Sequence, residues 1–311
     1  MKIEQVLKFE LSPIPTSMFN ENGLLRPAKT KSDLQSIGST ISFRNAHQPN
    51  LVLIDGCAVL YIVNWPTEAL VQDFVENMCS FIISKLKISD TAVVFDRYHD
   101  FSIKSSKRME RQSGLSRSHM LTLTSPLPPK NVTVGSSLNK VQLIKLICIR
   151  LIAIVPMLQQ SNFLLITDPE PNPIQIQNGV VITRYDLQTT HEEADLILVQ
   201  QAYKSVLENK TNFVTIISDD TDVFVLLSYF YFKLDLRSSI LMQLTTQSRY
   251  LIDIGSTVAK NIDIIPRLLA AHALSGCDTA APYHGIGKLK VIKKLREGAL
   301  VEVLRALTFM C

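Results

Sequence analysis

An α/β fold, with a parallel sheet covered by helices on both faces, is predicted by two observations. Apolar runs of strand length alternate along the chain with segments whose apolar residues recur at helical spacing. The strand-like runs are also continuously apolar, which is typical of strands buried on both sides. A chain of 311 residues, 46% of them hydrophobic, is long and apolar enough to bury the core that this fold needs.

The alternating pattern begins after residue 45. Residues 1–45 lack a clear period and are interpreted as an N-terminal extension, which leaves 46–311 as the folded domain. Two buried strands are predicted first, at Leu51–Asp55 and Thr91–Phe95. A helix is predicted between them over Glu68–Lys87, because its apolar residues follow helical spacing.

The second half of the chain continues the alternation after a basic stretch, residues 97–140, that has few large apolar residues. Helices are predicted over 139–158 and 192–207, whereas 223–232 is apolar throughout and stays ambiguous. The last region, 264–311, is predicted to be mainly helical. Strands are predicted at 163–167, 180–183 and 213–217, followed by a late hairpin of 239–244 with 248–252.

Composition indicates a globular intracellular protein. The five cysteines form no Cys-X-X-Cys pair, so we expect neither a zinc site nor a disulfide framework. Residues 1–10 carry charges where a signal peptide would be apolar. The most apolar stretch, 141–158, is interrupted by Lys145, Arg150 and Pro156, which favours a core helix over a membrane span. A net charge of +4 is too mild to indicate a nucleic-acid partner by itself.

Acidic residues follow several of the predicted strands. Asp55 and Asp96 end the first two, and Asp220 and Asp222 come after strand 213–217. Because the carboxyl ends of parallel strands meet at one edge of a sheet, we expect these carboxylates to converge. Alternation in an extended segment would also place Asp220 and Asp222 on the same side. Carboxylates gathered in this way repel one another unless cations lie between them, so the pattern predicts a divalent-metal site.

Further acidic residues could complete this site. Glu192, Glu193 and Asp195 open the helix 192–207, and Asp278 lies in the C-terminal region. Hard ions such as Mg²⁺ take oxygen ligands. A pair of such ions about 4 Å apart can activate a water and stabilise the leaving oxygen of a phosphoryl displacement. The predicted ligands of Mg²⁺ or Mn²⁺ are Asp55, Asp96, Glu192, Glu193, Asp195, Asp220, Asp222 and Asp278.

A glycine-rich segment, Gly285-Ile286-Gly287, stands at the start of a predicted helix. Without Cβ atoms, the backbone N–H groups of Gly285 and Gly287 could approach a phosphate at the positive end of the helix dipole. Lys288 and Lys290 add positive charge beside this segment. An ordinary turn between two helices, with a solvated basic face, is the alternative interpretation.

Five of these motifs, taken in order, resemble those of the flap-endonuclease/XPG group of PIN-like nucleases. The motifs are Ile54-Asp55, Val94-Phe95-Asp96, Glu192-Glu193-Ala194-Asp195, Asp220-Thr221-Asp222, and Gly276-Cys277-Asp278 with Gly285-Ile286-Gly287. The resemblance covers residues 50–300, approximately. It implies a PIN-like, Rossmann-like parallel sheet and a helix-hairpin-helix-type element within 264–311.

The resemblance also implies a function: a nuclear, divalent-metal-dependent and structure-selective nuclease, with DNA more expected than RNA as its partner. Residues 97–140 would correspond to the family's basic helical arch, and the Gly285 hairpin would bind the duplex backbone and is a candidate K⁺ site. The implied catalytic residues, holding two metal ions, are Asp55, Asp96, Glu193, Asp220, Asp222 and Asp278. The implied nucleic-acid-binding residues are Lys104, Arg108, Arg111, Gly285, Gly287, Lys288 and Lys290.

Two other functions remain open at this point. His191 stands where the family has the first Glu of its helix motif, with Glu192 and Asp195 as possible substitutes. A catalytically degenerate PIN-like scaffold that binds nucleic acid or protein is therefore the main alternative. A metal-dependent glycosyltransferase would explain Asp220-Thr221-Asp222, but it would leave Asp55 and the glycine-rich segment without a role.

Overall fold

The structure is a computed structural model that describes residues 31–97, 119–167, 172–189, 194–208, 211–245, 250–277 and 287–298. Within this part of the chain, the strands form one sheet in the order β1-β9-β8-β7-β2-β3-β4-β5-β6. The strands are β1 (Ser39–Ser42), β2 (Leu51–Asp55), β3 (Asp90–Val94), β4 (Leu164–Thr167), β5 (Ile174–Gln177), β6 (Val180–Thr183), β7 (Phe213–Ile217), β8 (Ser239–Gln243) and β9 (Tyr250–Asp253).

The centre of the sheet is parallel, as predicted. Strands β8, β7, β2, β3 and β4 run in one direction, each hydrogen-bonded to the next. Antiparallel pairs occur at the two edges, between β8, β9 and β1 and between β4, β5 and β6. The predicted fold class is therefore confirmed, with a sheet that is mixed overall.

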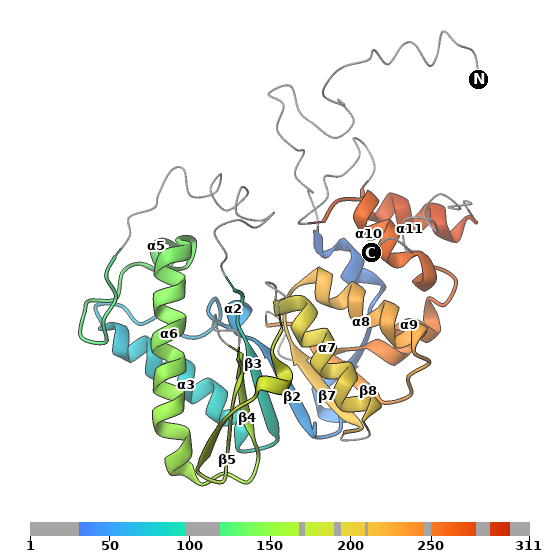
Figure 1. The fold of residues 1–311 in the computed structure, drawn as a ribbon. Helices are drawn as coiled ribbons and strands as arrows, with labels where there is room; N and C mark the ends of the chain where they lie inside the picture. The colour runs from blue at the N-terminus through green and yellow to red at the C-terminus, as the bar shows by residue number, and fades with distance from the viewer. Residues whose placement is uncertain are drawn as a thin grey trace, which may run out of the picture.

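Helices cover both faces of the sheet (Figure 1), with α3 and α6 on one face and α7, α8 and α9 on the other. The α-helices are α2 (Gly56–Val59), α3 (Val71–Leu86), α5 (Lys130–Gly135), α6 (Ser137–Ile154), α7 (Ala194–Leu207), α8 (Thr221–Lys233), α9 (Ile254–Lys260), α10 (Leu268–Leu274) and α11 (Lys288–Arg296). Short 3₁₀ helices are η1 (Lys31–Ile37), η2 (Phe43–Asn45), η3 (Val155–Leu158), η4 (Tyr185–Leu187) and η5 (Ile265–Arg267).

Side-chain alternation along the central strands feeds two hydrophobic cores. In β2, Leu51 and Leu53 face the core shared with α7 and α8, whereas Val52 and Ile54 face the core shared with α3 and α6. All four are at most 5% exposed. Burial on both faces is the physical reason why these strands are continuously apolar in the sequence.

Helix α6 is both long and apolar. Together with η3 it forms a stretch, Ser137–Leu158, that is long and apolar enough to cross a membrane. One face of α6 packs against α3, with Leu143, Ile147 and Leu151 fully buried. One face of the stretch therefore belongs to the core, whereas only 33% of its most apolar window is buried, so its assignment as a core helix stays a prediction.

The structure differs from the sequence-based expectations in three places. Residues 39–42, expected to lie in an extension, form β1 and pair with β9, and Leu34 is buried in the core. Strand β5 was not predicted, although the two-residue turn Asn178-Gly179 that joins it to β6 is a hairpin signal; both residues have positive φ. The ambiguous segment 223–232 lies in helix α8.

Two predicted regions are described only in part. Of the arch-like region 97–140, the structure describes residue 97 and residues 119–140, which include α5 and the start of α6. In the described part of the C-terminal region, α10 and α11 confirm the predicted helices, but the connection between them lies largely outside the described residues. The predicted helix-hairpin-helix element therefore stays a prediction.

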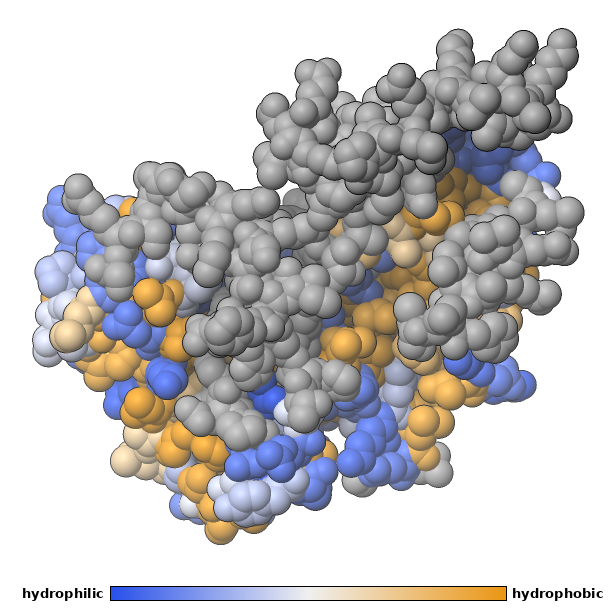
Figure 2. Space-filling model, turned by 45° about the horizontal axis from the view of Figure 1, so that its top comes forward, coloured by the Kyte–Doolittle hydropathy of each residue, from blue (hydrophilic) through white to orange (hydrophobic). Residues whose placement is uncertain are grey.

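Hydrophilic and hydrophobic patches interleave over the described surface of the face shown in Figure 2. The hydropathy of this face (Figure 2) therefore does not single out a binding surface, and the functional site is located from individual side chains.

Candidate metal centre

The acidic residues predicted to converge lie at one edge of the sheet. Strands β2, β3 and β7 are parallel neighbours, so their carboxyl ends share that edge. Asp55 is the last residue of β2, Asp96 follows β3, and Asp220 follows β7. Asp195 lies in the first turn of α7 and Asp222 in the first turn of α8.

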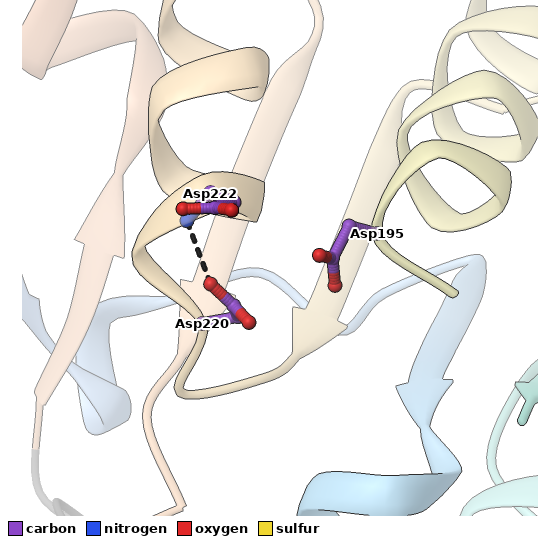
Figure 3. A group of neighbouring side chains, drawn as sticks. All are labelled: Asp195, Asp220 and Asp222. Atoms are coloured by element: carbon purple, nitrogen blue, oxygen red, sulfur yellow. Dashed lines mark hydrogen bonds between the residues drawn. The ribbon is translucent and has the colours of Figure 1, made fainter. Parts of the chain in front are cut away.

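Three of these carboxylates form a compact cluster (Figure 3). Asp195, Asp220 and Asp222 each offer an oxygen, and the three oxygens lie within 4.8 Å of one another. Asp195 is 7% exposed, and the other two are partly buried. Residues far apart in sequence therefore meet here because the starts of α7 and α8 lie side by side.

Local hydrogen bonding sets the positions of Asp220 and Asp222. Asp220 is the N-cap of α8, and its carboxylate accepts a hydrogen bond from the backbone N–H of Asp222 at 2.7 Å. The backbone N–H of Asp220 in turn donates to the Ser218 hydroxyl at 3.1 Å. The two carboxylates therefore share one side because a helix begins at this point, and the expectation of an extended segment was wrong.

Asp55 lies beside this cluster and is 6% exposed. Its carboxylate accepts hydrogen bonds from the backbone N–H of Ala58 and from the Ser218 hydroxyl, both at 2.9 Å. Burial, the largest cause, and the nearby charges of Asp96 and Asp220 together raise the pKa of Asp55 to about 7, while the two hydrogen bonds oppose the rise. In the metal-free protein, the Asp55 carboxyl group is therefore expected to be partly protonated near neutral pH.

Asp96 connects the end of β3 to the beginning of α7. Its Oδ1 accepts a hydrogen bond at 3.2 Å from the backbone N–H of Ala194, the first residue of that helix. An acidic side chain at a helix N-terminus is favourable because unsatisfied N–H groups point toward it. The contact places Asp195, the next residue in the chain, close to the strand ends.

A neighbouring acid, Asp219, points elsewhere. Its carboxylate accepts hydrogen bonds from the backbone N–H of Thr245, at 2.7 Å, and from the Thr245 hydroxyl. Thr245 follows β8, so Asp219 stabilises the connection after that strand. Of two consecutive acids, only Asp220 belongs to the cluster.

The cluster suits a hard divalent cation. All of its donors are carboxylate oxygens, the ligands that Mg²⁺ and Mn²⁺ prefer. In an octahedral Mg²⁺ site, neighbouring ligand oxygens are about 3 Å apart and opposite ones about 4.2 Å apart, so oxygens within 4.8 Å of one another are close enough to converge on one ion. Like charges at such distances also destabilise the metal-free state, and a bound cation would remove that repulsion.

Two residues of the site were missed in the sequence. Ser218 contacts both Asp55 and Asp220, and its position just after β7 was the available signal. His272 lies on α10 with its Nε2 2.7 Å from Oδ1 of Asp222. No sequence spacing links His272 to Asp222, because their contact depends on how α10 packs against α8.

The glycine-rich segment and its lysines are described from Gly287 onward. Gly287 is the exposed N-cap of α11, and Lys290 is exposed on that helix. Lys288, predicted to contact nucleic acid, is 2% exposed and points inward. Its ammonium lies 2.9 Å from Nδ1 of His272, so it is not available to a phosphate at the surface.

The remaining predicted site residues lie outside the described part of the chain. They are Lys104, Arg108, Arg111, Glu192, Glu193, Asp278 and Gly285. Their roles stay predictions.

No protein-family model matches this chain, and no curated protein matches it in sequence. Among solved structures, it is similar to the catalytic core of Rad2 in complex with DNA substrate, with a TM-score of 0.49 and 11% identity over 90% of this chain and 72% of that one. It is also similar to flap endonuclease-1 from Methanococcus jannaschii, with a TM-score of 0.47 and 15% identity over 88% and 79% of the two chains. The T5 D15 protein co-crystallised with metal ions has a TM-score of 0.42 and 16% identity over 81% and 77%.

Identities of 11–16% leave the activity of this chain to be judged from the residues of its own site.

Proposed function

We propose that the protein is a divalent-metal-dependent, structure-selective nuclease that hydrolyses phosphodiester bonds in nucleic acid. The observation that carries the proposal is the convergence of Asp195, Asp220 and Asp222 within 4.8 Å, with Asp55 beside them at the same sheet edge. Such a set, made of carboxylates alone, is suited to Mg²⁺ or Mn²⁺ and unsuited to zinc, which favours nitrogen and sulfur ligands.

The described carboxylates would divide the work of holding two ions. Asp195, Asp220 and Asp222 would hold one, and Asp55 and Asp96, at the ends of neighbouring strands, would contribute to the second. When bound, the ions would supply an activated water and stabilise the leaving oxygen of an in-line displacement. Ser218 orients Asp55 and Asp220 together, since its hydroxyl contacts both residues. Asp55 must release its proton before it can act as a ligand.

DNA is the proposed partner, and the nucleus the proposed location, because the resemblance of the motifs implies both. Gly287 at the exposed start of α11 would approach the phosphate backbone, and Lys290 would add positive charge beside it. Lys288 is not part of this proposed contact, because its ammonium is buried.

The experiment that tests this function is cleavage of labelled flap, bubble, single-stranded and duplex substrates in Mg²⁺ or Mn²⁺. It is run beside Asp220→Ala, with Asp219→Ala as the matched control, because Asp219 is the adjacent acid that bonds to Thr245 instead. We expect cleavage by the wild type and the control. Asp220→Ala should lose at least about a thousand-fold in rate, the equivalent of about 4 kcal/mol of transition-state stabilisation.

Equal cleavage by both variants would show that the acidic cluster is not the active site. A folded protein that binds nucleic acid but cuts none of the substrates would instead establish the inactive PIN-like scaffold. Preference among the four substrates would define which nucleic-acid structure is recognised.

A further inference from the structure

A chain of hydrogen bonds leads from the acidic cluster to the start of α11. Nε2 of His272 lies 2.7 Å from Oδ1 of Asp222, and Nδ1 of the same ring lies 2.9 Å from Nζ of Lys288. His272 is 7% exposed and Lys288 2%. Three helices, α8, α10 and α11, each contribute one member, so the chain forms only when all three are packed together.

The donor chemistry of lysine fixes the direction of these hydrogen bonds. An ammonium has three donors and no acceptor, so Nζ of Lys288 donates to Nδ1 of His272. Its other acceptors include the Gly276 carbonyl at 2.7 Å and the Ser275 hydroxyl at 3.5 Å. An imidazole that accepts at Nδ1 carries its proton on Nε2, and that N–H donates to Asp222.

The location of Lys288 is unfavourable unless its charge is balanced. It is the first residue of α11, where the helix dipole disfavours a positive charge. Its ammonium is also removed from water, and a buried cation needs a compensating charge or full hydrogen bonding. The Asp222 carboxylate, across the imidazole ring, provides negative charge. Lys288 is therefore a buried cation, unfavourable by itself, that is connected through His272 to a carboxylate of the acidic cluster.

We propose that His272 and Lys288 are positioning residues of the metal centre. Lys288 holds the His272 ring in one tautomer, and His272 holds the Asp222 carboxylate in the orientation that presents it to Asp195 and Asp220. The proposal rests on the proposed function, because it assigns these residues to the same metal site. It also gives Lys288 a role inside the protein in place of the predicted contact with nucleic acid.

The hydrogen-bonded chain of Asp222, His272 and Lys288, called the relay below, would also link the metal centre to the substrate-binding segment. Lys288 immediately follows Gly287, the residue proposed to approach the phosphate backbone. Its hydrogen bonds to His272 and to the Gly276 carbonyl hold the start of α11 against the end of α10. The position of α11 and the orientation of Asp222 are therefore set by one set of contacts.

The test is a titration of the full chain with Mn²⁺ in the absence of nucleic acid, followed through the signal of unbound Mn²⁺. Removing a group that orients a metal ligand typically costs 10- to 100-fold in affinity, so we expect Lys288→Met and His272→Ala to bind Mn²⁺ at least about ten-fold more weakly. Lys294→Met is the matched control, since Lys294 is an exposed α11 lysine paired with Glu297. The control should bind Mn²⁺ as the wild type does.

His272→Gln separates positioning from simple packing. The glutamine amide can donate to Asp222, and its carbonyl can accept from Lys288, so this variant should stay within roughly three-fold of the wild type. Wild-type affinity in both Lys288→Met and His272→Ala would overturn the proposal. An affinity for His272→Gln as weak as that of His272→Ala would also overturn it, because loss of shape alone would then explain the effect.

A spectroscopic measurement reports on the relay directly. Ring ¹⁵N signals of His272 in EDTA, assigned by their loss in His272→Gln, should show a neutral ring protonated at Nε2. Lys288→Met should shift those signals toward a mixture of tautomers. A wild-type ring protonated at Nδ1 would overturn the relay whether or not Lys288→Met folds.

The outcomes distinguish this inference from the proposed function. If the wild type binds Mn²⁺ and the relay variants bind it equally well, only the relay fails. If the wild type binds neither Mn²⁺ nor Mg²⁺, the proposed function fails, and the positioning role fails with it.

Discussion

At the Asp55 end of the site a carboxylate is buried among neutral donors, whereas at the Asp222 end a carboxylate faces a buried cation across an imidazole ring. Asp55 receives hydrogen bonds from Ala58 N–H and the Ser218 hydroxyl, and its pKa is raised to about 7. Asp222 contacts His272, which contacts Lys288. The ionised carboxylate is therefore disfavoured by burial at the Asp55 end, whereas its charge is balanced at the Asp222 end.

This difference indicates how the site can be both preformed and ready for cations. The Asp222 end is organised without metal, since Lys288 and His272 already balance and orient its carboxylate. At the Asp55 end, burial disfavours the ionised carboxylate. A bound cation would stabilise the ionised form, because positive charge favours it. Substitutions at the two ends should therefore change stability in opposite directions.

The largest expected effect is at the Asp55 end. Because the pKa of Asp55 is about 7 in the folded protein and 3.8 in the reference state, the folded protein binds this proton more tightly. Stability from this group is fully present below pH 4, approximately, and is lost as pH rises to about 7. In EDTA, Asp55→Asn should exceed the wild type near pH 8 by a few kcal/mol, about 4 at most.

Urea unfolding of the wild type and Asp55→Asn from about pH 4 to about pH 8 measures this effect. The difference between the two proteins should grow with pH, since other titrating groups cancel in the comparison. A difference that stays constant with pH would show that Asp55 is ionised in the folded protein throughout, and the contrast between the two ends would disappear.

At the Asp222 end the opposite sign is expected. Asp222→Asn removes the negative charge that faces Lys288 through His272, so it should lower the free energy of unfolding in EDTA by about 1–3 kcal/mol. Asp235→Asn is the control, because Asp235 has an 89% exposed side chain. A variant at position 222 that is more stable than the wild type would mean that repulsion from Asp195 and Asp220 outweighs the relay.

An effect of similar size is expected from the backbone beside Asp55. A Cβ at Gly56 would lie 2.3 Å from the buried ring of Phe95, so Gly56→Ala must displace that ring or the start of α2. Overpacking of this kind typically costs about 1–3 kcal/mol. Gly135→Ala is the matched control, since a Cβ there meets no atom of the described chain within 4 Å. Thermal or urea unfolding measures the stability of the two variants. Equal stability would show that the Phe95 ring or the start of α2 moves at little energetic cost.

The smallest effect on stability is expected beside the Asp222 end. Gly287 has a φ of −87°, and no atom of the described residues lies within 4 Å of its Cβ position, so Gly287→Ser should change stability by no more than about 0.5 kcal/mol. If the bare backbone approaches a phosphate, the same variant should bind nucleic acid more weakly while binding Mn²⁺ normally. Unchanged binding of both would remove Gly287 from the interface and leave Lys288 as the important residue of this segment.

Much of the fold followed from local patterns. The central strands were predicted because strands buried on both faces must be continuously apolar, as in Leu51–Asp55 and Phe213–Ile217. Strand β1 was missed because four residues at a sheet edge carry little pattern, and its pairing with β9 joins segments at opposite ends of the described chain. Local patterns are informative where burial is complete and weak at the edges.

For the site, the sequence by itself determined which carboxylates could converge. Acids placed at the ends of parallel strands, such as Asp55 and Asp96, must meet at one edge, because topology brings those ends together. Only the tertiary structure decided that Asp219 turns away to Thr245, and that Lys288 turns inward to His272. The physical reason is that a side chain's partners depend on which helices pack together, and contacts between α8, α10 and α11 have no signature in residue spacing.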